Sequence, residues 1–174
     1  MTINPPNKNG RRGILLPRWA IPPVWAVLVL VLQVLLPWVV SLYGPRIGWS
    51  PPAPGVWNSL GLVAVAAGIG AYTWSLTFHY RSYRTSVRAG FTPPHLVEDG
   101  PYRFSRNPMY AAGLFAWLGW TVFYGSPAVF LAMVLLGAIF SFGVIPREER
   151  QLEALFGEEY LRYKRSVRRW FGRY

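Results

Sequence analysis

Three long stretches of this chain contain no Lys, Arg, Asp or Glu, and they constrain its fold more than any other feature. They cover residues 19–45, 47–80 and 107–146. A helix of roughly 20 residues crosses the ~30 Å hydrocarbon core of a bilayer, so each of the first two stretches can hold one membrane-spanning helix. The third stretch is about twice that length and predicts two helices. We therefore expect an all-α integral membrane bundle with four transmembrane helices.

Prolines and glycines indicate where these helices begin and end. Pro22 and Pro23 suit the first turn of a helix, where a missing N–H costs nothing. Gly61, Gly68 and Gly70 predict a small-residue face for close helix packing in the second span. The four predicted spans are residues 22–42, 57–79, 108–123 and 127–145.

A polar segment at residues 147–167 follows the last apolar stretch. Its apolar side chains recur at intervals of three and four, which predicts an amphipathic cytoplasmic helix. Such a helix can lie on the membrane surface as a lid. The side chains that form this pattern are Leu152, Leu155, Phe156, Tyr160 and Tyr163.

The charges predict both the partner class and the topology. The chain has 174 residues, of which 52% are hydrophobic and 14% charged, and its formal net charge is +11. The basic residues flank the apolar stretches, so they indicate contact with membrane lipids and not with nucleic acid. Arg46 is the only basic residue in a predicted outer loop, so both termini and residues 80–107 should be cytoplasmic. We expect a multi-pass protein of a prokaryotic plasma membrane.

The remaining composition limits the kinds of site. The chain has no Cys, which excludes disulfides, thiolate metal sites and cysteine nucleophiles, and we expect no metal. Residues 1–17 are polar and basic and predict a flexible cytoplasmic arm, followed by one domain over residues 18–174. No small-residue cleavage site follows the first apolar segment, so the first span should remain in the mature protein.

Two polar runs could carry chemistry. Residues 94–110, PHLVEDGPYRFSRNPMY, are stiffened by prolines, and such a loop suits either an adenine or amino-acid group of a ligand or simply a turn. Asn107 and Pro108 fit the N-cap and first residue of a helix, but Arg106 beside them is unfavourable unless an anion binds there. Glu148 and Glu149 predict a solvated salt-bridge face, or one acid turned inward to hold a cationic ligand or to align a nucleophile.

Three consecutive features of residues 96–170 are LVEDGPYRFSRNPMY, an apolar hairpin and REERQLEALFGEEYLRYKRSVRRW. In this order they resemble the isoprenylcysteine carboxyl methyltransferase family and its relatives, the phospholipid methyltransferases. The resemblance implies a small membrane enzyme that binds S-adenosyl-L-methionine in a cytoplasmic pocket and releases S-adenosyl-L-homocysteine. The pocket would be closed by the C-terminal helix and open sideways to the bilayer for a lipophilic acceptor, an isoprenoid or a lipid.

The resemblance also implies roles for particular residues. Glu148, Asn107 and Tyr110 would be catalytic, and Glu148, Arg106 and Val144 would lie at the acceptor. The cofactor would be held by Pro94, His95, Leu96, Val97, Gly100, Tyr102, Asn107, Pro108, Met109 and Tyr110.

Two positions depart from the eukaryotic members of that family. Asn107 stands where they have His, so hydrogen bonding is kept but titration near neutral pH is lost. Val144 stands where they have Arg, four residues before the glutamate, which removes the evident partner for a prenylcysteine carboxylate. The acceptor atom, O, N or S, stays open, and Glu148 could take a proton from the acceptor or orient it.

Two other classes of function remain possible from the sequence. The chain could be a non-catalytic membrane protein that keeps the cofactor fold as a sensor or as a partner-binding module. It could also be a basic membrane anchor that recruits anionic lipid or nucleic acid.

Overall fold

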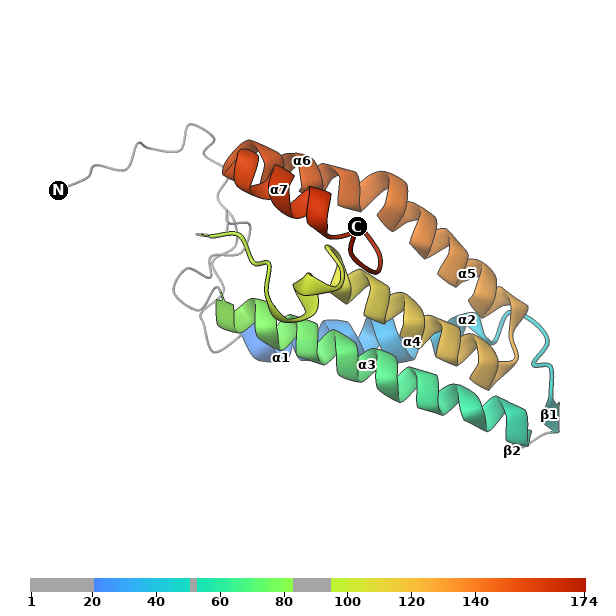
Figure 1. Cartoon of the computed structure of the whole chain (residues 1–174). Helices are drawn as coiled ribbons and strands as arrows, with labels where there is room; N and C mark the ends of the chain where they lie inside the picture. The colour runs from blue at the N-terminus through green and yellow to red at the C-terminus, as the bar shows by residue number, and fades with distance from the viewer. Residues whose placement is uncertain (1–20, 51–52, 83–94) are drawn as a thin grey trace, which may run out of the picture.

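The computed structural model describes residues 21–50, 53–82 and 95–174, and this part of the chain is mostly helical (Figure 1). The helices run roughly along one long axis. The hairpin of β1 (Trp49–Ser50) and β2 (Ala53–Pro54) lies at one end, and α6 (Ile145–Phe156) and α7 (Glu158–Ser166) lie at the other. The expectation of a helical membrane bundle is confirmed at this level.

The first helix contains a π-helical turn. It consists of α1 (Ile21–Leu30), η2 (Val31–Leu35) and α2 (Leu36–Val40) without interruption. A π-helical turn leaves backbone carbonyls without their usual intrahelical partner. Here the indole Nε1 of Trp117 donates to the carbonyl of Leu32 at 3.2 Å, and that of Trp120 donates to the carbonyl of Gln33 at 2.5 Å.

The closest helix pair is α3 (Val56–Ser82) against α4 (Pro108–Tyr124). A Cβ on Gly61 would lie 2.5 Å from the Gly119 carbonyl oxygen, and one on Gly68 would lie 2.5 Å from the Ala116 nitrogen. The predicted small-residue face is therefore confirmed at these two glycines. It is wrong for Gly70, which has no described neighbour within 4 Å and faces away from α4.

At the end of the bundle near β1 and β2, several contacts meet at one arginine. The Arg46 guanidinium lies 5.0 Å from the ring centroid of Trp49 and 5.1 Å from that of Tyr124. Its Nη2 also donates to the Ser41 hydroxyl at 2.8 Å. Gly125 ends α4 with a φ of 55°, a left-handed conformation that favours glycine, and α5 (Pro127–Ala138) begins two residues later.

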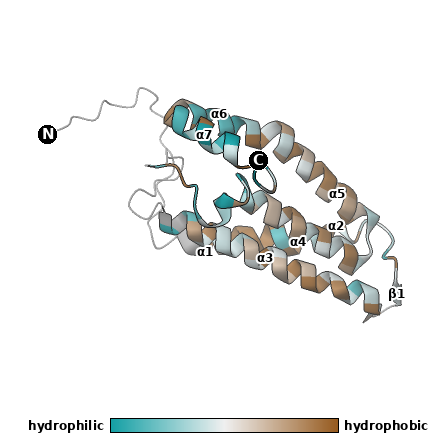
Figure 2. Cartoon of the chain, viewed as in Figure 1, coloured by the Kyte–Doolittle hydropathy of each residue, from teal (hydrophilic) through white to brown (hydrophobic). Residues whose placement is uncertain are grey.

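The last long helix continues further than the sequence predicted. It runs through α5, η4 (Ile139–Val144) and α6 without a break, and it ends at Gly157, whose φ is 52°. Pro146 does not stop the helix, because it lies in the first turn of α6, two residues after the π-helical η4, where the regular hydrogen-bond ladder is already interrupted. The single helix expected over residues 147–167 is therefore two helices, α6 and α7. Figure 2 shows the change from a hydrophobic α5 to hydrophilic α6 and α7.

Within the described residues, three helices are long and apolar enough to cross a membrane: Pro23–Val40, Val56–His79 and Pro127–Phe156. The predicted third span corresponds to α4, which has 17 residues and many buried side chains. A crossing by α4, and with it the count of four, remains a prediction.

Candidate active site at the polar end of the bundle

The helix α7 packs onto the loop that precedes α4. Tyr160 and Tyr163 of α7 form a buried cluster with Val97, Tyr102 and Val167. The Tyr163 hydroxyl donates to the Tyr102 carbonyl at 2.7 Å. The two tyrosines of the predicted amphipathic pattern thus bury against the loop at residues 95–107.

The short helix η3 (Gly100–Arg103) shapes this loop. Gly100 has a φ of 58°, and a Cβ there would lie 2.6 Å from the ring of Phe78. Pro101 and Tyr102 follow and are buried, and the Tyr102 hydroxyl lies 2.9 Å from His79 Nδ1. The loop is therefore fixed to α3 on one side and to α7 on the other.

The chain then returns over the start of α4 as a C-terminal strap, residues 167–174. Backbone N–H groups of Arg106 and Gly172 donate to the carbonyls of Arg168 and Phe104 at 3.0 and 2.8 Å. Asn107 occupies the predicted N-cap position, but its side chain does not cap the helix. Its Nδ2 donates instead to the Arg169 carbonyl at 3.1 Å, so the predicted capping role of this side chain is wrong.

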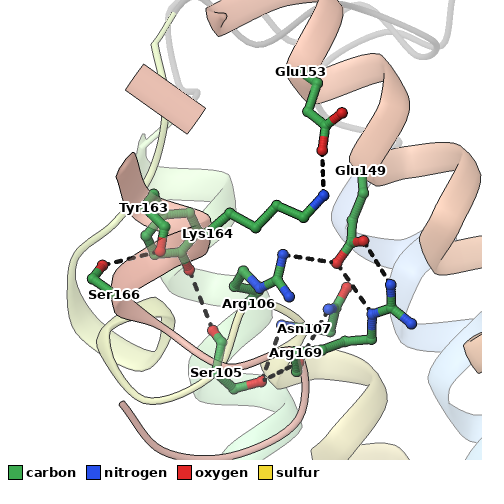
Figure 3. A network of polar contacts seen from close by, with 9 residues as sticks. All are labelled: Ser105, Arg106, Asn107, Glu149, Glu153, Tyr163, Lys164, Ser166 and Arg169. Atoms are coloured by element: carbon green, nitrogen blue, oxygen red, sulfur yellow. Dashed lines mark hydrogen bonds and ion pairs between the residues drawn. The ribbon is translucent and has the colours of Figure 1, made fainter. Parts of the chain in front are cut away.

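A buried ion cluster joins the strap to α6 (Figure 3). Arg106 Nη1 lies 3.0 Å from Glu149 Oε1, and both side chains are 7% exposed. Arg169 contacts the same carboxylate through Nη2 at 2.7 Å and Nε at 3.2 Å. Hydrogen bonding to Glu149 raises the pKa of Arg169, so its guanidinium stays charged. The interpretation of both acids as a solvated face is wrong for Glu149.

Glu148 has a different environment. It is exposed, and it accepts a hydrogen bond of 2.8 Å from the Tyr110 hydroxyl. The Tyr110 ring centroid lies 4.6 Å from that of Phe140 in η4. The structure therefore brings together two of the predicted catalytic residues, Tyr110 and Glu148, where apolar helix meets polar helix.

The other predicted site residues have separate partners. Arg106 pairs with Glu149, Asn107 with the strap, and Tyr102 with His79, so these three do not meet Glu148 directly. Val144 lies half-buried in η4, Pro108 is buried and Met109 is half-buried.

Most of the predicted cofactor loop is described. Pro94 lies outside the described residues; His95 is exposed, Leu96 is half-buried and Val97 is buried. No backbone hydrogen bond joins residues 96–98 to any other described residue. Buried or half-buried backbone groups normally have partners, so this short stretch can still bind a ligand through its N–H and C=O groups.

A groove of about 490 Å³ lies between α7 and the strap. It is lined by Arg106, Leu161, Lys164, Arg165 and Tyr174. Three of these five residues are cationic, and Lys164 also forms an ion pair with Glu153. Arg106 is paired with Glu149 and Arg165 with Glu158, so ion pairs line the groove and each of its cations already has a carboxylate partner.

Sequence reasoning missed Arg169 and Lys164 as parts of this site, and it named Glu149 only as one of two adjacent acids of which one could turn inward. Arg169 contacts Glu149 from within a turn of the strap, which is closed by a hydrogen bond from the Arg168 N–H to the carbonyl of Gly172, whose φ is 95°. A glycine among the last residues was the one signal of such a turn. No group of three or more His, Asp or Glu side chains within the described ranges could hold a metal ion.

Part of the chain is similar to known proteins. The sequence profile of the family described as Phospholipid methyltransferase matches residues 56–159, from α3 to the start of α7. An uncharacterized protein of Haemophilus influenzae is 40% identical over 62 residues, which cover 36% of this chain and 98% of that protein. Protein-S-isoprenylcysteine O-methyltransferase A of Arabidopsis thaliana is 29% identical over 111 residues. That alignment covers 63% of this chain and only 56% of the plant protein. No solved structure matches the chain significantly.

Proposed function

Because the chain belongs to the phospholipid methyltransferase family, we propose that it transfers a methyl group from S-adenosyl-L-methionine to a lipophilic acceptor at the cytoplasmic face of a membrane. The contact between Tyr110 and Glu148 carries this proposal. It places an acid and a hydroxyl on the matched part of the chain, where the apolar α4 and η4 meet the polar α6. A lipid acceptor would present its reactive headgroup at this boundary.

The residues present fit the proposed cofactor. Residues 96–98 make no backbone hydrogen bond to another described residue, so their N–H and C=O groups offer donors and acceptors for an adenine. When bound, the cofactor supplies an electrophilic methyl group on a sulfonium sulfur. The residues that would hold it are those of the loop and of the start of α4: Pro94, His95, Leu96, Val97, Gly100, Tyr102, Asn107, Pro108, Met109 and Tyr110.

The side chains would act through alignment and exclusion of water. Methyl transfer is a displacement that needs close, in-line placement of the acceptor and no metal. The Phe140 ring packs on Tyr110 and would limit water at the reacting atoms. The Tyr110 hydroxyl holds the Glu148 carboxylate in place, and Arg106 and Val144 would lie nearer the cofactor and the acceptor chain.

Glu148 has one of two tasks, depending on the acceptor. An amine must lose a proton before it can attack, and a Glu148 carboxylate oxygen would take that proton. A carboxylate acceptor is already ionised and would need only orientation. Val144 provides no cation for such an acceptor, which favours an amine or a hydroxyl over a carboxylate.

The proposal includes a topology. All four apolar helices would cross the membrane, α4 included, and both termini and residues 80–107 would be cytoplasmic. Residues 1–17 would form a basic arm, and residues 18–174 one methyltransferase domain in the plasma membrane.

Methyl transfer from labelled S-adenosyl-L-methionine to a bacterial lipid extract tests the proposal. Glu148→Gln should lower the rate by about 100-fold or more, because general acid–base steps contribute that much, without weakening cofactor binding. Glu159→Gln, on an exposed acid of α7, is the matched control and should keep the wild-type rate. Unchanged turnover in Glu148→Gln would remove this residue from the reaction. Cofactor binding without turnover on any extract would favour a non-catalytic sensor.

A further inference from the structure

The first buried residue of the first helix is polar. From Pro23 to Leu32, every described side chain is exposed except the half-buried Val29. Trp25 and Leu30, for example, are 42% and 58% exposed. Gln33, in the π-helical η2, is then only 9% exposed. The half of the helix nearest the active-site end therefore stands apart from the bundle, and Gln33 marks the point where it rejoins.

The Gln33 amide lies against α4 next to the candidate active site. A Cβ on Gly113 would lie 2.7 Å from Gln33 Nε2 and 3.8 Å from a ring carbon of Tyr72. Gly113 is three residues after Tyr110, about 4.5 Å further along the helix. Tyr110, Gly113, Trp117 and Trp120 recur at intervals of three and four, so they share one face of α4. Gln33 thus lies about one helical turn deeper than the Tyr110 and Glu148 pair.

One atom of this amide has no partner. Gln33 Oε1 is buried and accepts no hydrogen bond from any described residue. An unsatisfied polar atom is costly in hydrocarbon, and polar residues inside a membrane commonly mark the path of a substrate. Hydrogen bonds from Trp117 and Trp120 hold the backbone of η2 in place, so the amide is fixed toward α4. The missing partner must be a hydrogen-bond donor.

We infer that Gln33 forms the deep end of the acceptor site and selects acceptors that carry a second polar group, a hydroxyl or an N–H. The inference rests on the proposed function. The acceptor lies along the Tyr110 and Gly113 face of α4, with its reacting atom at Glu148 and its donor group on Gln33 Oε1. The positions on α4 that face these two groups, Tyr110 and Gly113, are about 4.5 Å apart along the helix axis. The exposed half of the first helix has few neighbours among the described residues, so the acceptor enters beside it from the bilayer.

Two synthetic amines test this selectivity: hexadecylamine and 3-hydroxyhexadecylamine, whose hydroxyl oxygen lies about 5 Å from the nitrogen in the extended chain, close to one helical turn. Their binding to the full chain in detergent is measured by equilibrium dialysis. The wild type should bind the hydroxylated amine about 3-fold to 30-fold more tightly, the effect of one hydrogen bond inside a membrane protein. Gln33→Leu should bind the two amines equally.

Gln151→Leu is the matched control, because Gln151 is exposed on α6, and it should keep the wild-type preference. If Gln33→Leu does not fold, Gln33→Met keeps the length of the side chain without its polar atoms and should show the same loss. Equal binding of the two amines by the wild type, or a preference that survives in the folded Gln33 variant, would overturn the inference.

Cofactor binding and methyl transfer to the lipid extract are measured on the same preparations. Intact transfer without a preference between the amines would remove only the role of Gln33. Absence of transfer on every extract would remove the proposed function and with it the acceptor role of Gln33, even if the preference between the amines persisted.

Discussion

Glu148 and Glu149 are neighbours in sequence but differ in environment. Glu149 is 5% exposed and pairs with two arginines, one from the loop before α4 and one from the C-terminal strap. Glu148 is exposed and accepts a hydrogen bond from Tyr110. Removing one partner of a buried ion pair leaves an uncompensated charge, whereas an exposed acid can be replaced at little cost. One acid therefore stabilises the site, and the other is free for chemistry.

Glu149→Gln should destabilise the protein because it leaves the buried Arg106 guanidinium without its counter-charge. We expect the free energy of unfolding to fall by about 3–5 kcal/mol. Glu148→Gln should change it by less than about 0.5 kcal/mol. Denaturant unfolding of both variants in one detergent measures the difference. Equal losses in the two variants would mean that Glu149 is not the structural acid.

Tyr160 makes the stability of the folded chain depend on pH in the alkaline range. Burial and, to a smaller extent, the Glu149 carboxylate raise its pKa from 10.0 to about 12, although the Arg106 guanidinium partly opposes them. The folded chain thus holds the phenolic proton more tightly than the unfolded chain. The resulting stability is complete below pH 10 and is lost as the pH rises from about 10 to about 12.

Tyr160→Phe should remove that part of the pH dependence. Its unfolding temperature should fall less between about pH 10 and 12 than that of the wild type. Tyr43→Phe is the control, because Tyr43 is 79% exposed. A thermal unfolding series across this pH range measures the slopes, and identical slopes in Tyr160→Phe and wild type would contradict the assignment.

Among the helices, α3 and α4 depend most on the absence of side chains. A Cβ on Gly119 would lie 2.5 Å from the Val65 backbone nitrogen and 2.8 Å from the Gly61 carbonyl oxygen. These neighbours are backbone atoms and cannot rotate away. The α3 and α4 pair in turn positions the loop at residues 95–107 and Tyr110. A change in the packing of these two helices would therefore also move residues of the candidate site.

Gly119→Ala should therefore push the two helices apart. Overpacking of this kind should lower the free energy of unfolding by about 1–3 kcal/mol. Gly70→Ala is the matched control, because no described atom lies within 4 Å of the added Cβ, and it should be neutral or slightly stabilising. Both are measured by unfolding in detergent. A loss in Gly70→Ala as large as that in Gly119→Ala would show that α4 contacts a different face of α3.

Helices were predictable where a property of their own residues was enough to determine them. Long uncharged stretches require helices in a bilayer because every backbone group must be satisfied within its own segment. The two π-helical turns were not predictable, because η2 depends on distant indole donors and η4 allows Pro146 to remain inside a helix. Gly70 shows the same limit, since composition cannot say which side of α3 meets α4.

For the molecule as a whole, the order of motifs predicted the family, and the contacts between distant segments could not be read from it. Tyr110 and Glu148 are 38 positions apart and meet because α5, η4 and α6 form one continuous helix beside α4. Arg169 meets Glu149 from within a turn of the strap. Long-range contacts of this kind depend on where helices end, which is the least predictable feature of a sequence.

The number of membrane crossings can be tested across the whole molecule. The chain has no Cys, so single cysteines can be introduced without background labelling. Ser50→Cys lies in the loop between the first two spans, and Glu158→Cys lies at the start of α7, and both positions are exposed.

If α4 crosses the membrane, three crossings separate the two positions and they lie on opposite sides. If α4 does not cross, two crossings separate them and they lie on the same side. We expect a membrane-impermeant maleimide to label Ser50→Cys in intact cells and Glu158→Cys only after permeabilisation, because the basic residues around α7 favour the cytoplasm. Labelling of both in intact cells would place α7 and the candidate active site outside and contradict the proposed topology.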